Sequence, residues 1–258
     1  MAISSEVVAF ESNEDDEPIL ISVVAPTLNE IDNIGNYIQS VSDNLKEIGR
    51  FEIVIVDDNS KDGTREFLSE RKEVDPNLKV LFNDKREGLS SSQLEGIDLC
   101  NGDYTIVMDS DLQHPAEKIK DIVSKLEEGY DLVVCSRYVD GGSVGNRNPI
   151  RGVISRGAIA LTHLFIAQSR SLKDPVSGFY GLRKGLKTSS SGYCRGYKSL
   201  LYPLVMNNGI RVTEIPFDFR KRVKSNSKIV ANWRFFINYL MEMHYVLRLS
   251  RIQKRTNL

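Results

Sequence analysis

The stretch "DYTIVMDSDLQHP", residues 103–115, decides the fold class. After its first residue it continues as a hydrophobic, strand-like run, typical of a strand buried on both faces, and passes directly into two aspartates separated by one serine. Two ionised carboxylates this close repel each other, and both lose hydration when they are buried, so a bound cation is the usual compensation. The stretch therefore predicts a buried strand that delivers acidic side chains to one end of a sheet.

Similar apolar runs recur through the first half of the chain, each followed by an amphipathic stretch. The strands are expected at 19–25, 51–57, 78–82, 103–109 and 130–136, and the helices between them near 30–48, 62–73, 90–100 and 115–128. Strands that are apolar throughout and alternate with helices indicate a parallel sheet covered on both faces. The pattern predicts an α/β fold with a mostly parallel central sheet.

The second half of the chain is less regular. We expect a helix at 150–167, a segment at 174–182 that turns back toward the sheet, and a strand at 209–219 in which Pro216 indicates an edge or a bulge. A last amphipathic helix is expected at 229–249. The organisation predicted is an acidic, disordered lead (1–18), one α/β domain (19–228) and an amphipathic, basic C-terminal helical segment (229–258).

Charge is distributed unevenly along the 258 residues, although the net charge of -1 argues against a nucleic-acid partner. Residues 1–18 hold six acids and no Lys or Arg, whereas residues 220–258 hold ten Lys or Arg and one acid, Glu242. A basic end suits phosphates, whether of a nucleotide, a lipid headgroup or a membrane surface. For the final ten residues a solvated polar face is the alternative.

Cysteine usage and hydropathy bear on the compartment. The three cysteines are widely spaced without a CxxC pair, which is typical of a reducing compartment and not of a disulfide framework or a zinc site. The N-terminus lacks the build of a signal peptide, and no apolar run reaches 18 residues. We expect a cytoplasmic protein, peripheral on the cytoplasmic face of a membrane.

Three acidic stretches follow predicted strands: "APTLNE" (25–30), "VDDNSKDGT" (56–64) and "MDSDLQ" (108–113). In an open α/β sheet, ligands bind beyond the carboxyl ends of the strands. Asp109 and Asp111 are two residues apart in an extended segment, so both can reach one hard divalent cation, and Gln113 offers an oxygen on the same alternation. Such a cation, Mg²⁺ or Mn²⁺, would neutralise a leaving diphosphate. The alternative is that Asp111 caps a helix beginning near Pro115.

These stretches also carry a resemblance to a known family. "APTLNE", "VDDNSKDGT", "GDYTIVMDSDLQHP", "CSRY", "RGVISRGA", "DPVSGF" and "EIPFDFRKRVKSNSK" resemble, in order and at matching intervals from Ile19 to Lys228, the motifs of family 2 glycosyltransferases with the GT-A fold. They are most similar to the polyprenol-phosphate branch, the dolichol-phosphate mannose synthases and their close relatives. The resemblance implies inverting transfer of a hexose, first of all mannose from GDP-mannose, to dolichyl or polyprenyl phosphate. Relatives that use UDP-glucose share nearly every motif, so the sugar and the base stay open.

The resemblance also implies roles for particular residues. The nucleotide-sugar would contact Pro26, Leu28, Glu30, Val56, Asp58, Asp109, Ser110, Asp111, Gln113, Arg222 and Lys228. Asp109, Asp111 and Gln113 would hold the metal, and Asp111, Arg137, Arg222 and Lys228 would be catalytic.

This chain departs from the family pattern at two positions. It has Leu28 where an aromatic residue is frequent, and Ser225 where the R-x-x-G-x-S-K segment usually has glycine. The first departure bears on base stacking and the second on the mobility of the segment. Independently of the family, Thr27 and Glu30 have the spacing of a helix capping box, which is an alternative role for both.

The acceptor phosphate would be held by Arg137, Arg151 and Ser155. The planar guanidinium of arginine binds phosphate oxygens in pairs, and residues 151 and 155 share one helical face. Surface ion pairs are the alternative for the two arginines. A phosphate acceptor, with a second pKa of about 6, is already a nucleophile near neutrality.

Two other functions stay open at this point. If the acceptor were a saccharide hydroxyl, a carboxylate base would be required, and Asp174 lies near a turn where it could serve. The third reading, from another class, is a non-catalytic module that binds a nucleotide or phosphate.

The predicted C-terminal helix suits a membrane interface. Aromatic residues would sit at headgroup depth and basic residues would meet lipid phosphates: Trp233, Phe235, Phe236, Tyr239 and Tyr245, then Arg248, Arg251, Lys254 and Arg255. Asn238, Glu242 and Arg234 are expected on a narrow polar side. The alternative is a helix packed on its own domain or on a membrane-anchoring partner subunit.

Overall fold

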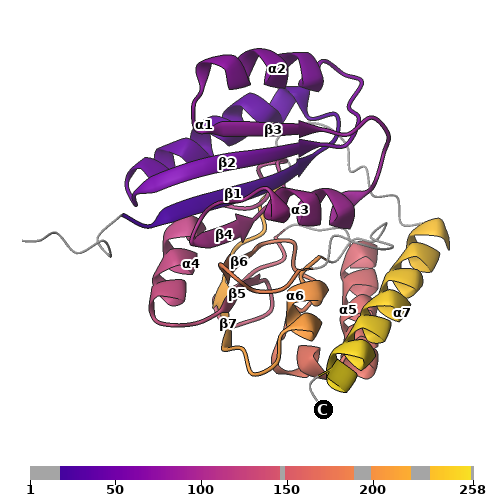
Figure 1. Ribbon diagram of the computed structural model, residues 1–258. Coiled ribbons are helices and arrows are strands. Elements are labelled where there is room, and N and C mark those ends of the chain that lie inside the picture. The colour runs from indigo at the N-terminus through magenta and orange to yellow at the C-terminus, as the bar shows by residue number, and fades with distance from the viewer. Residues whose placement is uncertain (1–17, 146–148, 189–198, 222–232, 257–258) are drawn as a thin grey trace, which may run out of the picture.

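The computed structural model describes residues 18–145, 149–188, 199–221 and 233–256 (Figure 1). A seven-stranded sheet runs in the order β3-β2-β1-β4-β6-β5-β7. Its strands are β1 (Leu20–Thr27), β2 (Arg50–Asp57), β3 (Leu78–Phe82), β4 (Tyr104–Val107), β5 (Leu132–Ser136), β6 (Tyr180–Arg183) and β7 (Val212–Pro216). The helices are α1 (Ile31–Lys46), α2 (Thr64–Val74), α3 (Leu89–Asp98), α4 (Lys118–Glu127), α5 (Pro149–Phe165), the short 3₁₀ helix η1 (Ala167–Ser171), α6 (Leu201–Met206) and α7 (Trp233–Thr256).

The mostly parallel sheet expected from the sequence is confirmed. Every neighbouring pair is parallel except those made by β6, which runs antiparallel to both β4 and β5. The expectation that 174–182 turns back toward the sheet is therefore correct. β7 lies at the edge of the sheet with Pro216 as its last residue, where the missing N–H interrupts no ladder.

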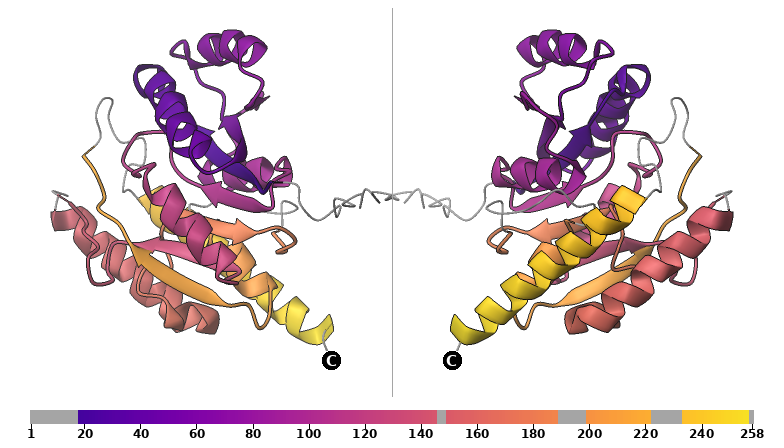
Figure 2. Two further views of the ribbon diagram at one scale, coloured as in Figure 1. Left: turned by 90° about the vertical axis from the view of Figure 1, so that its left-hand side faces the viewer. Right: turned by 90° about the vertical axis from the view of Figure 1, so that its right-hand side faces the viewer.

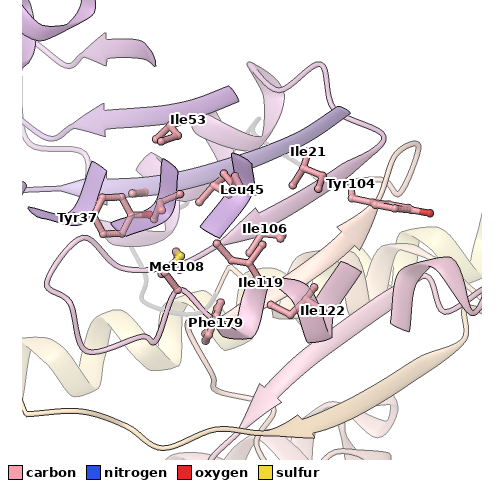
Figure 3. Packing of buried hydrophobic residues seen from close by; sticks show 14 of the residues in the cluster. Ile21, Tyr37, Leu45, Ile53, Tyr104, Ile106, Met108, Ile119, Ile122 and Phe179 are labelled. Carbon is pink, nitrogen blue, oxygen red and sulfur yellow. The ribbon is translucent and has the colours of Figure 1, made fainter. Parts of the chain in front are cut away.

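The core forms on both faces of β1 because successive side chains point to opposite faces. Ile21 and Val23 pack with α1 and α4 in the largest buried cluster, which Figure 3 shows from close by. Val24 faces the opposite layer, and a Cβ on Gly96 of α3 would lie only 2.4 Å from Val24 Cγ1. The absence of a side chain at this glycine lets α3 approach the sheet closely.

α7 packs on its own domain, as one reading of the sequence allowed (Figure 2). The Tyr239 hydroxyl lies in hydrogen-bonding distance of Thr162 and donates to the Ala158 carbonyl of α5 at 2.9 Å. Glu242 was expected on the polar side, and this prediction is wrong: its side chain is fully buried and accepts a hydrogen bond from Ser90 of α3 at 2.6 Å. The hydroxyl provides a partner that makes burial of a carboxylate tolerable.

A second buried carboxylate, Glu52, joins the amino-terminal ends of β1 and β2. It accepts hydrogen bonds from the Ser22 hydroxyl and the Asn101 backbone N–H, both at 2.6 Å, and it pairs with Lys79. Burial raises the pKa of Glu52, but these hydrogen bonds and the Lys79 charge outweigh burial, so the pKa lies below its ordinary value. Glu52 therefore stabilises the folded state in its ionised form.

This arrangement predicts a pH-dependent contribution to stability. A lowered pKa in the folded state means that the stabilisation is present above the unfolded pKa and is lost as the pH falls through the folded pKa. We expect Glu52→Gln to lower the free energy of unfolding at pH 7, and the difference from wild type to shrink as the pH is lowered below 4.5. Urea denaturation at several pH values checks this, with the exposed Glu70→Gln as the matched control. A difference that stays constant with pH would contradict it.

Candidate functional site

The acidic loops meet at one edge of the sheet. β1 lies between β2 and β4, so the strand order changes direction beside β1, and ligands of open α/β sheets bind beyond the carboxyl ends of the strands at such a point. The segments that follow these strands are 28–30, 58–63 and 108–114. The sequence prediction that these polar strand ends lie together is correct.

Each of the three loops contains a non-glycine residue in the left-handed conformation. The φ angles are 50° at Asn29, 65° at Asn59 and 63° at Leu112. Asparagine tolerates this conformation, whereas a leucine there is strained. Strain of this kind concentrates at functional sites, and at Leu112 it lies between Asp111 and Gln113.

The first two loops are joined by hydrogen bonds into one rigid unit. The Asn29 backbone N–H donates to the Ser60 hydroxyl at 2.7 Å, and the Lys61 N–H donates to the Asn29 side-chain oxygen at 2.7 Å. Glu30 receives the Asn33 amide at 2.6 Å, while its own backbone N–H donates to Thr64. The capping-box alternative is wrong, because Thr27 is the last residue of β1 and α1 begins after Glu30, with no side-chain cap.

Asp57 and Asp58 are adjacent in sequence but make different contacts. Asp57 is fully buried, accepts from the Ser60 N–H and pairs with Arg65 at 3.2 Å. Asp58 accepts from the backbone N–H groups of Glu87 and Gly88 at 2.6 and 3.0 Å, so it also fixes the start of α3. The expected nucleotide contacts Pro26 and Val56 are buried register partners on β1 and β2, next to Asp58.

The loop after β4 holds both aspartates of the DxD sequence. The Ser110 hydroxyl donates to the Pro26 carbonyl at 3.1 Å, which ties this loop to β1. Burial, followed by the charges of Asp109 and Asp111, raises the pKa of the Tyr37 hydroxyl well above its ordinary value. Both carboxylates therefore act on the same buried region beneath the edge.

Asp111 does not cap a helix. Its carboxylate accepts from the Gln113 N–H at 3.1 Å within the loop, and α4 begins only at Lys118. The Gln113 amide nitrogen donates to the Arg220 carbonyl at 2.9 Å, and the Arg220 N–H donates back to the Gln113 carbonyl at 3.0 Å. This pair of bonds fastens the DxD loop to the segment that precedes Arg222.

Arg137 lies at the end of β5 and is buried, with 8% of its side chain exposed. Its Nε and Nη2 donate to the two oxygens of Asp174, each at 2.7 Å, and its backbone N–H donates to the same carboxylate. Burial alone would lower the pKa of the guanidinium, but the Asp174 bonds and the nearby Asp109 raise it. The alternative of a surface ion pair is correct in that Arg137 forms an ion pair, but wrong in its location, because this pair is buried.

Ser155 of α5 lies beside the same strand end, where the Tyr138 hydroxyl donates to it at 3.2 Å. The structure therefore brings Ser155 next to the residue that follows Arg137. Arg151 lies in the first turns of α5, and its side chain is outside the described part of the chain, as are Arg222 and Lys228 altogether. Leu28 is half-buried beside Asn29.

Sequence reasoning missed two residues that shape this edge. The histidines have no metal-ligand spacing, which predicts local packing or a cap for His114; the ring does pack, and its Nδ1 also accepts from the Asp109 N–H at 2.9 Å. Asp174 was considered as a base for a hydroxyl acceptor, yet it holds Arg137. The spacing D-x-D-x-x-H is a local signal for the first, whereas no local signal marks a partner 37 residues away.

The fold and the acidic switch-point edge define a glycosyltransferase of the GT-A type. The chain belongs to Glycosyl transferase family 2, whose family model matches residues 22–194, and the resemblance seen in the sequence is thereby confirmed.

The chain is also similar to two curated relatives, and it shares its fold with a solved structure. It is 36% identical to a dolichol-phosphate mannosyltransferase of Pyrococcus furiosus over 88% of this chain and 64% of the relative, so it spans less than two thirds of that relative's length. It is 30% identical to a polyprenol monophosphomannose synthase of Mycolicibacterium smegmatis over 80% of each chain. Glucosyl-3-phosphoglycerate synthase from Mycobacterium tuberculosis shares the fold, with a TM-score of 0.63, 21% identity, and coverage of 90% of this chain and 80% of that one.

Proposed function

We propose that this enzyme transfers mannose from GDP-mannose to dolichyl or polyprenyl phosphate with inversion at the sugar, forming a lipid-linked sugar donor for protein glycosylation. Relatives named for this reaction, 30–36% identical, support the sugar and the acceptor. The observation that carries the proposal is the buried guanidinium of Arg137, which lies close enough to Asp109 for their charges to interact. A cationic anion-binding group beside a diphosphate site is what transfer between two phosphates requires.

A divalent cation, Mg²⁺ or Mn²⁺, fits the acidic edge. Asp109, Asp111 and the oxygen of Gln113 would hold it, and the cation would neutralise charge on the departing diphosphate. The donor set suits a shared site, because both carboxylates act on the same buried region at Tyr37. Among the described residues no three His, Cys, Asp or Glu side chains gather around one point, so a cation here would also need oxygens of the donor diphosphate. A structure of a fold relative was determined with Mn²⁺ and UDP, which supports the same class of cofactor.

The nucleotide-sugar would lie along the rigid unit formed by the first two loops. Pro26, Leu28, Glu30, Val56 and Asp58 are proposed to contact the base and ribose, and Ser110 joins that unit to the metal loop. Arg222 and Lys228 are proposed to contact the diphosphate. The paired hydrogen bonds between Gln113 and Arg220 would bring that basic segment to the DxD loop.

Arg137 can hold the acceptor phosphate while it stays paired. Asp174 occupies the edge of the guanidinium formed by Nε and Nη2, which leaves the donors of Nη1 for a phosphate oxygen. Arg151 and Ser155 would complete this acceptor site from α5. A phosphate oxygen attacks without a base, and Asp174, committed to Arg137, is poorly placed to serve as one. This disfavours a saccharide hydroxyl as the acceptor.

An apolar surface of α5 and α7 suits the contact with a membrane. On α5 the exposed stripe is Val153, Ile154, Gly157, Ala160, Leu164 and Phe165, with Val153 69% and Leu164 65% exposed. On α7, Leu240 and Met241 are exposed near His244 and the basic residues Arg248 and Arg251. Apolar side chains flanked by arginine favour a bilayer interface with anionic lipid.

We propose that this surface rests on the membrane, and that a membrane-anchoring partner subunit is the second candidate for it. In the described part of the chain, no helix combines the length and the hydropathy needed to cross a bilayer. Cys100 and Cys135 are free thiols, which supports the cytoplasmic face. The aromatic residues Trp233, Phe235 and Phe236 have side chains outside the described part.

The test is transfer of radiolabelled sugar from GDP-mannose and from UDP-glucose into an extract containing dolichyl and polyprenyl phosphates, with and without Mn²⁺. We expect metal-dependent label in the lipid phase from GDP-mannose, strongly reduced in Asp111→Asn and unchanged in Glu70→Gln. Label from UDP-glucose alone would overturn the assignment of GDP-mannose as the donor. Capture only by added saccharides would support a hydroxyl acceptor, and no turnover of either donor would support a non-catalytic module.

A further inference from the structure

His114 lies directly against the first carboxylate of the DxD sequence. Its Nδ1 accepts the Asp109 backbone N–H at 2.9 Å, and its Nε2 is 4.0 Å from Asp109 Oδ2. Because an N–H points at Nδ1, that nitrogen carries no proton, and the proton of the neutral ring is on Nε2. The protonated nitrogen of the ring is therefore the one that lies 4.0 Å from the Asp109 carboxylate.

The orientation of this ring is held from three sides by aromatic residues. It stacks on Phe179 with centroids 5.0 Å apart and a 17° interplanar angle. The rings of Phe217 and Phe219 meet it edge-on, each at 5.7 Å. His114 is buried, so rotation of the ring would require all three neighbours to move.

Two hydrogen bonds close the loop 109–114 on itself. One joins the Asp109 N–H to His114, and the other joins the Gln113 N–H to the Asp111 carboxylate. Both bonds span Leu112, which has the strained left-handed conformation. Both aspartates therefore belong to a loop that is closed by the hydrogen bond to Nδ1 of His114.

We propose that His114 is a positioning residue that fixes Asp109 for the cation of the proposed active site. The inference rests on the proposed function only in assigning a cation to Asp109 and Asp111. Nδ1 fixes the backbone of Asp109, and the protonated Nε2 lies 4.0 Å from its carboxylate. Partners that orient metal ligands in this way raise metal affinity by about 10- to 100-fold in proteins.

Three substitutions separate positioning from packing. His114→Phe keeps an aromatic ring in the box but removes the acceptor for the Asp109 N–H. His114→Asn keeps an acceptor near the position of Nδ1 but loses the ring, and His114→Gln places its amide near the position of Nε2. Packing alone predicts that function follows ring retention, whereas positioning predicts that it follows the acceptor.

The measurement is Mn²⁺ binding by the full chain in the presence of GDP, and separately of UDP, from the electron paramagnetic resonance signal of free Mn²⁺. Melting temperatures of the same samples are recorded without metal. We expect the Mn²⁺ dissociation constant to rise about 10-fold in His114→Phe, and to recover most of the way toward wild type in His114→Asn although this variant melts lower. If His114→Phe does not fold, the Asn and Gln variants decide, and Asn is expected to bind Mn²⁺ more tightly.

Wild-type affinity in His114→Phe, or affinities that follow the melting temperatures, would overturn the positioning role alone. Failure of the wild-type protein to bind Mn²⁺ with either nucleotide would instead contradict the cation site of the proposed function. Tight Mn²⁺ binding with label delivered only to saccharides would overturn the lipid acceptor and leave the role of His114 standing. The two proposals therefore fail on different observations.

Discussion

Asp174→Ala is expected to lower the free energy of unfolding by about 3–5 kcal/mol, because it leaves the guanidinium of Arg137 buried without its partner. The Asp174 side chain is fully buried and accepts three hydrogen bonds from N–H groups of Arg137, so these bonds are lost together with the carboxylate charge while the charge of Arg137 remains. The pair also joins β5 to the turn before β6, whose position is held by Glu214 of β7 through the Lys173 and Asp174 N–H groups. Urea denaturation measures the change.

A second variant separates stability from the acceptor role. Replacing the buried pair with apolar residues of similar size, as in Arg137→Met with Asp174→Leu, is expected to recover most of the lost stability. Transfer to the lipid phosphate should stay lost, because no cationic group remains to hold it. The matched control is Asp121→Ala, which removes an exposed partner of Lys118 and should cost less than about 1 kcal/mol. A loss in Asp174→Ala no larger than in the control would show that the pair does not hold this corner.

The order of strands and helices was predictable because it depends on local patterns. Residues 51–57 form a short, mostly apolar run with clear bounds, and β2 appears at Arg50–Asp57. The edge with its acidic loops followed from the same alternation, since carboxyl ends of parallel strands meet at one edge. Predicted helix boundaries were less accurate: α4 begins at Lys118, three residues after Pro115, because the loop first makes the turn at Asp111.

The hydrogen-bond and ion-pair partners of the buried charged residues were not predictable, because they join segments far apart in the chain. Nothing near Arg137 identifies Asp174 as its partner, and nothing near Glu242 identifies Ser90. A charged residue on an amphipathic helix is normally assigned to the solvent side. Glu242 is an exception, because the Ser90 hydroxyl donates to its buried carboxylate. Asp58 is a similar case, since its backbone partners Glu87 and Gly88 belong to a loop beyond the next strand.

Asp111→Asn is expected to abolish stabilisation of the protein by Mn²⁺ and to reduce transfer by about 10²- to 10³-fold. The amide keeps an oxygen for the Gln113 N–H, so the turn at Asp111 is preserved and the change is one of charge. A cation that binds only the folded protein at 100 times its dissociation constant adds about 2.7 kcal/mol of stability. For a chain of this size that corresponds to a rise in melting temperature of about 2–4 °C per kcal/mol, which thermal denaturation resolves.

Without metal, the same substitution should leave the melting temperature unchanged or raise it. Asp109 and Asp111 repel in the absence of a cation, and both charges act on the buried Tyr37 hydroxyl. Removing one charge relieves this repulsion, so metal-free stability and metal-dependent activity change in opposite directions. If Asp111 were merely structural, its substitution would lower both the metal-free melting temperature and the activity. Glu70→Gln removes the same charge from an exposed position on α2 and should alter neither. A Mn²⁺-dependent rise in Asp111→Asn equal to that of wild type would remove Asp111 from the cation site.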